Sequence, residues 1–285
     1  MDDVGTLDEL FVRIVPARGE TRARLAIVHG FAEHGDRYLS LAERLADRGV
    51  EAHLLDYHGH GRSPGPRGLI PSEEAAVGAV VALLERLRAL DGQLPVAAFG
   101  HSFGGALVLR AAQLRPDLVD AVVASAPYLV SALPDPPWVI GLASAAARLA
   151  PRLRTKPLDA GTVSNVEAEV RAYDQDPLVD RGGVRLGSIR ALHALGPHVL
   201  RDAAALVTPT LIVHGSDDAL ASLEGSRQLH LAADGGDVEL REVPGGAHAL
   251  LHDAQADRVA EDVVAWFAQH LALPEADTSS GAATA

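Results

Sequence analysis

Short apolar runs alternate with longer stretches of helical character along most of this chain. The runs are bounded by glycine and proline, and most lack the two-residue alternation of a half-exposed strand, as expected for strands that are buried on both faces. This order of elements predicts an α/β fold in which helices flank a mostly parallel central sheet. The predicted buried strands are residues 25–29, 52–56, 96–100, 121–125, 211–214 and 238–243.

Residues 11–15 follow a different pattern, because their apolar and polar side chains alternate. Such alternation is typical of a strand with one face in solvent, so it predicts an antiparallel edge strand ahead of the parallel set. Among the predicted helices, the second begins at Ser72, which with the two glutamates that follow is a typical capped start. The predicted helices are residues 38–48, 72–90, 104–114, 222–232 and 255–271.

Residues 128–195 interrupt the alternation, because the segment is rich in proline and contains no apolar run of the core-strand type. Its two apolar helical pieces are residues 139–149 and 187–195. We expect this segment to be a helical cap inserted over the sheet edge, with residues 1–127 and 196–273 forming the core. The tail, residues 274–285, consists mainly of Pro, Ser, Thr, Ala and Gly, so we expect it to be disordered.

The composition narrows the classes of partner and chemistry. Hydrophobic residues make up 48% of the chain and aromatic residues only 4%, so the core must be built mostly of Ala, Val and Leu. The net charge of −13 repels nucleic acid backbones, so we expect no nucleic-acid partner. The absence of cysteine excludes disulfides, thiolate zinc sites and a cysteine nucleophile. Without a secretory leader or an apolar run of about 18 residues, a cytoplasmic protein is expected.

A Gly-x-Ser-x-Gly sequence at residues 100–104 places Ser102 between a predicted strand and a predicted helix. In this context the motif forms a nucleophile elbow, a strained turn that projects the serine hydroxyl outward. Glycines on both sides let the strand and the helix approach each other closely. The pattern therefore predicts Ser102 as a catalytic nucleophile.

A serine hydroxyl needs a base to take its proton and an acid to orient that base. Asp218 follows the strand at 211–214, and His248 follows the strand at 238–243, so both are expected at the same sheet edge as Ser102. The order Ser, acid, His is the one expected for this fold. On the sequence alone Asp217 is a competing acid, because either aspartate could instead be a turn residue that caps the next helix.

Ester or amide hydrolysis at Ser102 would develop a negatively charged oxygen, which needs backbone N–H donors. In an elbow of this type the residue after the nucleophile, here Phe103, donates one N–H, and the loop after the first parallel strand donates another, here predicted at Phe31. Gly30 allows that loop to turn sharply. An alternative is that Gly30 serves only as a turn residue.

The chain shows no motif for a cofactor. His58 and His60 have a spacing found in some metal sites, but such pairs usually come with further His or carboxylate ligands at short range, and this run is more simply explained as a glycine-rich turn after a strand. No Gly-x-Gly-x-x-Gly sequence follows any predicted strand, so a dinucleotide fold is not supported. We therefore predict neither a metal nor a cofactor.

Several segments together resemble the monoacylglycerol lipase and lysophospholipase branch of the α/β hydrolases. The similarity runs from about residue 25 to residue 271, and its combination of segments is far more specific than any one motif. The matching segments are the entry loop at 29–38, a second loop at 56–63 and 64–68, the acid loop at 214–218, the histidine loop at 246–248 and residues 173–179 of the insertion.

The resemblance implies the α/β-hydrolase fold and hydrolysis of a glycerol ester that carries one fatty acyl chain, through an acyl-enzyme on Ser102. It favours Asp218 over Asp217 as the acid. It also suggests that Glu33 and Arg37 bind glycerol hydroxyls, although a structural ion pair that braces the oxyanion loop is the alternative. His252 lies near a head-group histidine of some members, one residue further from the catalytic histidine.

The resemblance also assigns a role to the cap. Its apolar side chains are expected to guide an acyl chain toward Ser102 or to contact a membrane surface, with packing of the cap on the core as the alternative; they are Val139, Ile140, Leu142 and Leu149. Phe103 stands where the branch often has Met, which changes the acyl pocket and keeps the backbone N–H. The remaining hypotheses are an esterase, lysophospholipase or aminopeptidase of the same fold, and a small-molecule binding protein without turnover.

Overall fold

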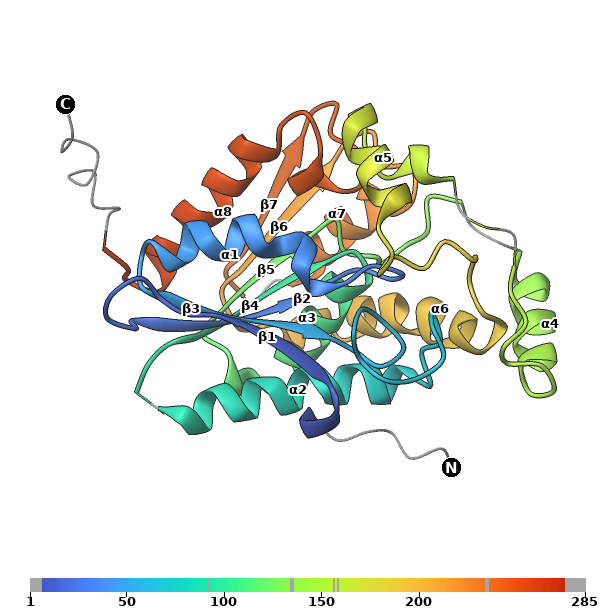
Figure 1. Cartoon of the computed structure of the whole chain (residues 1–285), viewed down its shortest axis with the longest axis horizontal. Helices are drawn as coiled ribbons and strands as arrows, with labels where there is room; N and C mark the ends of the chain where they lie inside the picture. Colours follow the sequence, from blue (N-terminus) through green and yellow to red (C-terminus); the bar gives the residue numbers. More distant parts are fainter. Residues whose placement is uncertain are drawn as a thin grey trace.

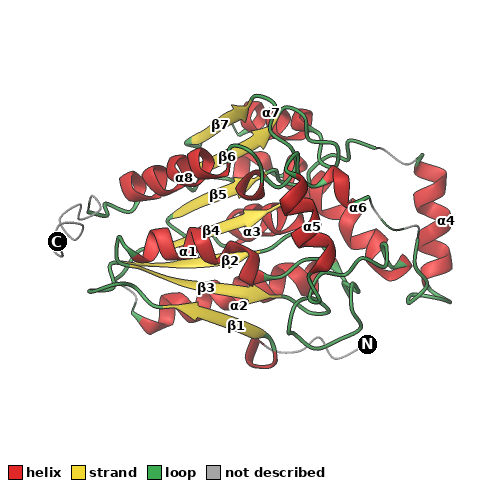
Figure 2. Cartoon of the chain, turned by 45° about the horizontal axis from the view of Figure 1, so that its top comes forward, coloured by secondary structure: helices red, strands yellow, loops and turns green. Residues whose placement is uncertain are grey.

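In the part of the chain that the computed structural model describes, seven strands form one sheet with the order β1-β3-β2-β4-β5-β6-β7 (Figures 1 and 2). The described residues are 7–91, 93–133, 136–155, 157, 159–233 and 236–274. The strands are β1 (Phe11–Val15), β2 (Ala23–Val28), β3 (Val50–Asp56), β4 (Val96–His101), β5 (Ala121–Ser125), β6 (Thr210–Gly215) and β7 (Val238–Val243).

The pairing of the strands confirms the predicted sheet. Strand β1 pairs antiparallel with β3 at one edge, and the other neighbouring strands pair parallel. The central strands β4, β5 and β6 are buried along their whole length, which explains why their sequences are apolar runs without alternation. All the parallel strands end at the same edge, where the predicted site residues follow β2, β4, β6 and β7.

Helices cover both faces of the sheet (Figure 2). On one face α1 (Leu39–Ala46) and α8 (Ala256–His270) pack against a core of Leu, Val and Ala side chains that includes Trp266 and Phe267. On the other face α2 (Glu73–Leu90), α3 (Phe103–Leu114) and α7 (Leu223–Ala232) pack on a second core. The Ser72 side chain accepts a hydrogen bond from the Ala75 N–H at 3.1 Å, which confirms the predicted cap of α2.

The segment between β5 and β6 adds three helices and no strand of the main sheet among its described residues. They are α4 (Pro137–Ala147), α5 (Glu167–Gln175) and α6 (Leu186–Arg201). Helix α6 extends beyond residue 195 through Pro197 and packs on α3, so it joins the inserted segment to the core. Helix α4 lies at the far end of the molecule against α6 (Figure 1). The tail predicted to be disordered lies outside the described residues except for Pro274.

Short 3-10 turns complete the described elements, and one of them shapes the entry loop. The turn η2 (Gly35–Tyr38) carries the chain from the loop after β2 into α1. The other turns are η1 (Leu7–Glu9), η3 (Pro116–Leu118), η4 (Ala160–Thr162), η5 (Ala203–Ala205) and η6 (Leu250–His252). None of the helices in the described residues has the length and apolar character that a membrane span requires.

Candidate active site

Ser102 occupies a strained turn between β4 and α3. Its φ of 53° and ψ of −118° lie outside the regions that L residues favour, as a nucleophile elbow requires. The flanking glycines allow the turn: a Cβ on Gly100 would lie 2.3 Å from the Gly104 carbonyl oxygen, and a Cβ on Gly104 would lie 2.3 Å from the Val28 carbonyl oxygen. Any larger residue at either position would force the strand and the helix apart.

Asp218 and His248 are joined at the same sheet edge. Nδ1 of His248 lies 2.7 Å from Oδ2 of Asp218, a hydrogen-bond distance between loops that follow β6 and β7. His248 is 5% exposed and Ser102 is 8% exposed, so this pair and the serine lie below the surface. The ring centroid of His248 is 4.8 Å from that of His101, the residue immediately before Ser102. The structure therefore brings His248, the predicted base, beside the turn that carries Ser102.

The second oxygen of Asp218 fixes the carboxylate in place. Oδ1 accepts hydrogen bonds from the N–H groups of Leu220 and Ala221 at 2.8 and 2.9 Å. Burial alone would raise the pKa of Asp218, but His248 and His214 hold that pKa well below the ordinary aspartate value. Asp218 is therefore ionised at neutral pH and can stabilise a positive charge on His248.

Asp217 takes no part in this arrangement. Its side chain is exposed, and its Oδ1 accepts a hydrogen bond from the hydroxyl of Ser216 at 2.8 Å. Of the two aspartates that the residues alone left open as the acid, Asp218 is the one whose carboxylate contacts His248.

The oxyanion loop lies directly against the elbow. A Cβ on Gly30 would be 3.2 Å from Cβ of Ser102, so the loop after β2 and the nucleophile are in contact. Within the described residues the N–H groups of Phe31 and Phe103 have no hydrogen-bond partner, and Phe103 is the first residue of α3, where helical N–H groups lack intrahelical acceptors. Two backbone donors are thus free on the residues predicted to form the oxyanion hole.

Glu33 braces this loop from inside. Its Oε1 accepts hydrogen bonds from the Gly30 N–H and the Tyr38 hydroxyl, both at 2.6 Å, and its Oε2 accepts one from Nε of Arg37 at 2.8 Å. Burial opposes the charge on Glu33, yet His101 and Arg37 hold its pKa well below the ordinary glutamate value. The geometry thus matches the structural ion pair rather than direct contact of Glu33 with a ligand.

Arg37 and His252 each lie against a side chain of α5. The guanidinium carbon of Arg37 lies 4.9 Å from the ring centroid of Tyr173 on α5, and Nη1 and Nη2 are not used in the bond to Glu33. Nδ1 of His252 lies 3.2 Å from Oε2 of Glu169, while Nε2 has no partner among the described residues. Burial and the nearby Arg37 charge lower the pKa of His252, which favours the neutral ring.

The inserted segment is tied to the loops that carry these residues. The Asp180 N–H donates to the Ala32 carbonyl at 2.7 Å, and Ala32 itself has a φ of 70°. The Ala249 N–H, next to His248, donates to the Val163 carbonyl at 2.8 Å. A shift of the insertion would therefore also move the backbone next to Phe31 and His248.

The histidines at 58 and 60 form a turn. Nδ1 of His60 lies 3.0 Å from the His58 carbonyl oxygen, and the His60 ring lies edge-on to Phe31 with centroids 5.3 Å apart. Over the whole described part of the chain, no group of three or more His, Asp or Glu side chains is arranged to hold a metal ion.

Sequence reasoning missed His214, the last but one residue of β6. Its Nε2 lies 3.2 Å from Oδ2 of Asp218, and its Nδ1 lies 2.7 Å from the Ser226 hydroxyl. The hydroxyl can donate to Nδ1, which leaves a proton on Nε2, and that nitrogen lies 3.1 Å from the Ala221 carbonyl oxygen as well as close to the carboxylate. The available signal was the four-residue spacing between His214 and Asp218 across a strand end.

Comparison with known proteins identifies the family. The family model described as "Serine aminopeptidase, S33" matches residues 19–255. The monoacylglycerol lipase of Mycolicibacterium smegmatis is 34% identical over 88% of this chain and 90% of its own, and the human monoglyceride lipase is 30% identical over 92% and 88%. The crystal structure of the Paleococcus ferrophilus monoacylglycerol lipase superposes with a TM-score of 0.84 at 30% identity, over 92% of this chain and 99% of the other. The chain belongs to the serine aminopeptidase S33 family, in the monoacylglycerol lipase branch of the α/β hydrolases.

Proposed function

We propose that this protein is a serine ester hydrolase that cleaves monoacylglycerol to a fatty acid and glycerol, through an acyl-enzyme on Ser102. The observation that carries the proposal is the bond between His248 and Asp218 beside a strained Ser102, in a chain of the monoacylglycerol lipase branch. A binding protein without turnover would have no need for a buried acid and base at the elbow.

Each step of the hydrolysis has a side chain to perform it. Nε2 of His248 takes the proton from the Ser102 hydroxyl as Oγ attacks the ester carbonyl, and the Asp218 carboxylate stabilises the imidazolium that results. The Phe31 and Phe103 N–H groups bind the negatively charged oxygen of the tetrahedral intermediate. His248 then gives its proton to the departing glycerol oxygen. Water repeats the sequence on the acyl-enzyme and releases the fatty acid.

The glycerol head group of the substrate can bind to the side chains of Arg37 and His252. Nη1 and Nη2 of Arg37 can donate to glycerol hydroxyls, and the unpartnered Nε2 of His252 can accept from or donate to one. Glu33 contributes indirectly, because it holds Arg37 by its Nε. A glycerol with two free hydroxyls fits these donors better than a triester, which has none.

Helix α4 is the part of the insertion suited to contact a lipid surface. It carries no charged residue, and its side chains Trp138 and Leu142 are 71% and 65% exposed. Beyond its end Leu149 is 92% exposed. Apolar side chains gathered on one exposed segment favour docking on a bilayer surface, where the substrate resides. Leu142 and Leu149, two of the side chains predicted to guide an acyl chain or to contact a membrane, are thus exposed to solvent.

The substrate is tested by comparing turnover of mono-, di- and triacylglycerols with short p-nitrophenyl esters and aminoacyl amides. We expect the highest kcat/KM for monoacylglycerol and a sharp fall for the triester. Equal or better turnover of the triester, or activity confined to the amides, would contradict the choice of substrate. Activity confined to lysophospholipid or to short esters would assign the protein to those neighbouring activities.

The lipid contact is tested by sedimentation with phosphatidylcholine vesicles, which carry no net charge and so do not repel a protein of net charge −13. The double variant Trp138→Ser/Leu142→Ser should lose vesicle binding. Leu231→Ser is the matched control, because Leu231 is 77% exposed on α7, a helix outside the inserted segment. Equal binding by the wild type and the double variant would show that α4 is not the docking element.

A further inference from the structure

The direction of the Phe31 N–H is set by the carbonyl of Gly30, because the two groups belong to one peptide unit. In a trans peptide the C=O and the N–H point in opposite directions, and the described residues contain no cis peptide. Whatever holds the Gly30 carbonyl oxygen therefore also aims the Phe31 N–H. This inference rests on the proposed function, since it concerns the donor that would bind the oxyanion.

Two side chains hold that carbonyl oxygen. The Tyr57 hydroxyl donates to it at 2.9 Å, and Nδ1 of His29 lies 2.7 Å from it. Glu33 holds the preceding peptide through the Gly30 N–H, so the Gly30 backbone is fixed on both sides. Of these groups, Tyr57 directly follows a different strand, β3, and its hydroxyl reaches the loop that follows β2.

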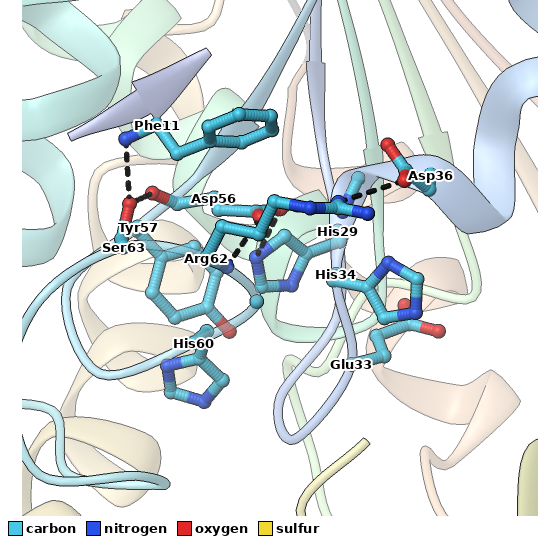
Figure 3. A network of polar contacts seen from close by, with 12 residues as sticks. Phe11, His29, Glu33, His34, Asp36, Asp56, Tyr57, His60, Arg62 and Ser63 are labelled. Carbon is cyan, nitrogen blue, oxygen red and sulfur yellow. Dashed lines mark hydrogen bonds and ion pairs between the residues drawn. The ribbon is translucent and has the colours of Figure 1, made fainter. Parts of the chain in front are cut away.

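Tyr57 is itself held rigidly. It is 1% exposed, and its ring stacks on His29 with centroids 4.3 Å apart and planes 18° apart. The ring of His60 lies 4.4 Å from that of Tyr57 and 5.6 Å from that of His29, and Figure 3 shows the three rings gathered beside the Asp56 loop. Burial raises the pKa of Tyr57 well above its ordinary value, so the hydroxyl keeps the proton that it donates.

Asp56, the residue before Tyr57, bonds to both the loop after β2 and the turn after β3. Oδ1 of Asp56 accepts a hydrogen bond from the Gly35 N–H at 2.7 Å, and Oδ2 accepts one from the Arg62 N–H at 2.8 Å (Figure 3). Gly35 ends the oxyanion loop, and Arg62 lies in the turn that follows β3. Asp56 thus fixes the backbone next to Tyr57 to the same loop whose Gly30 carbonyl the Tyr57 hydroxyl holds.

We propose that Tyr57 is a positioning residue for the hydrolysis: its hydroxyl holds the Gly30 carbonyl and so aims the Phe31 N–H at the oxyanion. Tyr57 does not touch the substrate. Tyr57 contributes when negative charge develops on the carbonyl oxygen of the ester. That charge is present in the transition state and absent from the bound ester. Loss of the hydroxyl should therefore lower kcat and leave KM nearly unchanged.

The test compares Tyr57→Phe with Thr210→Val, and both are assayed on monoacylglycerol and a p-nitrophenyl ester. The Thr210 hydroxyl also donates to a backbone carbonyl, that of Thr208, at 2.9 Å in a buried position, but at the opposite end of the sheet. We expect Tyr57→Phe to lower kcat about 10- to 100-fold, less than the about 10²- to 10³-fold loss on removing an oxyanion donor. Thr210→Val should keep the wild-type kcat.

A third variant covers the case in which Tyr57→Phe does not fold. Replacement of Tyr57 by 4-aminophenylalanine keeps the ring and a donor, so its kcat should stay within about threefold of the wild type if donation is what matters. The proposal is overturned if folded Tyr57→Phe has the kcat of the wild type, whether or not its KM rises. It is also overturned if the 4-aminophenylalanine variant does not restore turnover.

The same assays separate this proposal from the function on which it rests. Wild-type turnover that is lost in Ser102→Ala supports the proposed function whatever the Tyr57 variants do. No turnover by the wild type, or full turnover by Ser102→Ala, would overturn the proposed function and the role of Tyr57 with it. A normal kcat in Tyr57→Phe, with Ser102→Ala inactive, would overturn the role of Tyr57 alone.

Discussion

Buried histidines make the fold sensitive to acid, and His60 allows the effect to be measured. The His60 side chain is 1% exposed, and burial, helped by the nearby His29, lowers its pKa to about 3. In the unfolded chain the same ring has a pKa of about 6.5. Between these values the unfolded state binds a proton that the folded state does not, so stability is complete above the unfolded pKa and falls as the pH drops.

The size of the effect follows from the titration range. Between pH 7 and pH 4.5 the unfolded ring takes up nearly a full proton over about two pH units, which removes about 2–3 kcal/mol of folding free energy. His60→Phe removes this titration. The difference in unfolding free energy between the two pH values should therefore be about 2–3 kcal/mol smaller in the variant than in the wild type.

The assay is urea denaturation of each protein at both pH values, and the comparison within each protein cancels any direct effect of the substitution on stability. His230→Gln is the control, because His230 is exposed on α7 whereas His60 is buried. An equal loss of stability in the wild type and His60→Phe would refute the reasoning.

Two further predictions concern the elbow and the acid. Gly104→Ala places a Cβ 2.3 Å from the Val28 carbonyl oxygen and should lower the unfolding free energy by about 1–3 kcal/mol. Gly78→Ala on α2, where a Cβ would have no atom within 4 Å, should raise the unfolding free energy by about 0.5–1 kcal/mol. Urea denaturation measures both variants, and equal effects would contradict the close contact at Gly104. Asp218→Asn should lower kcat by about 10³- to 10⁴-fold and Asp217→Asn should not change it; the reverse order in ester hydrolysis would assign the acid to Asp217.

The sheet was predictable because burial on both faces leaves a direct mark on the sequence. Strands β1, β5 and β7 have the predicted bounds, and the other strands differ from prediction by one or two residues at one or both ends. Helix α5 was missed for the converse reason. It has no buried residue among its nine, so its sequence shows no apolar periodicity.

The site was predictable where a residue follows a strand end or matches a motif, as Ser102, Asp218 and His248 do. The loops were harder to interpret, because the partner of a buried polar group is set by tertiary contacts. Glu33 could equally have faced a ligand until the structure showed its bonds to Gly30, Tyr38 and Arg37. Tyr57 carried no sequence signal for its bond to a loop that precedes it by 27 residues.

The central claim is that Ser102 is the nucleophile of an ester hydrolase, and intact-mass spectrometry after reaction with a fluorophosphonate measures it most directly. The account predicts that the wild type gains the mass of one phosphonyl group and that Ser102→Ala gains none. An adduct of equal yield on Ser102→Ala, or an unmodified wild type under conditions that label a known serine hydrolase, would contradict the claim.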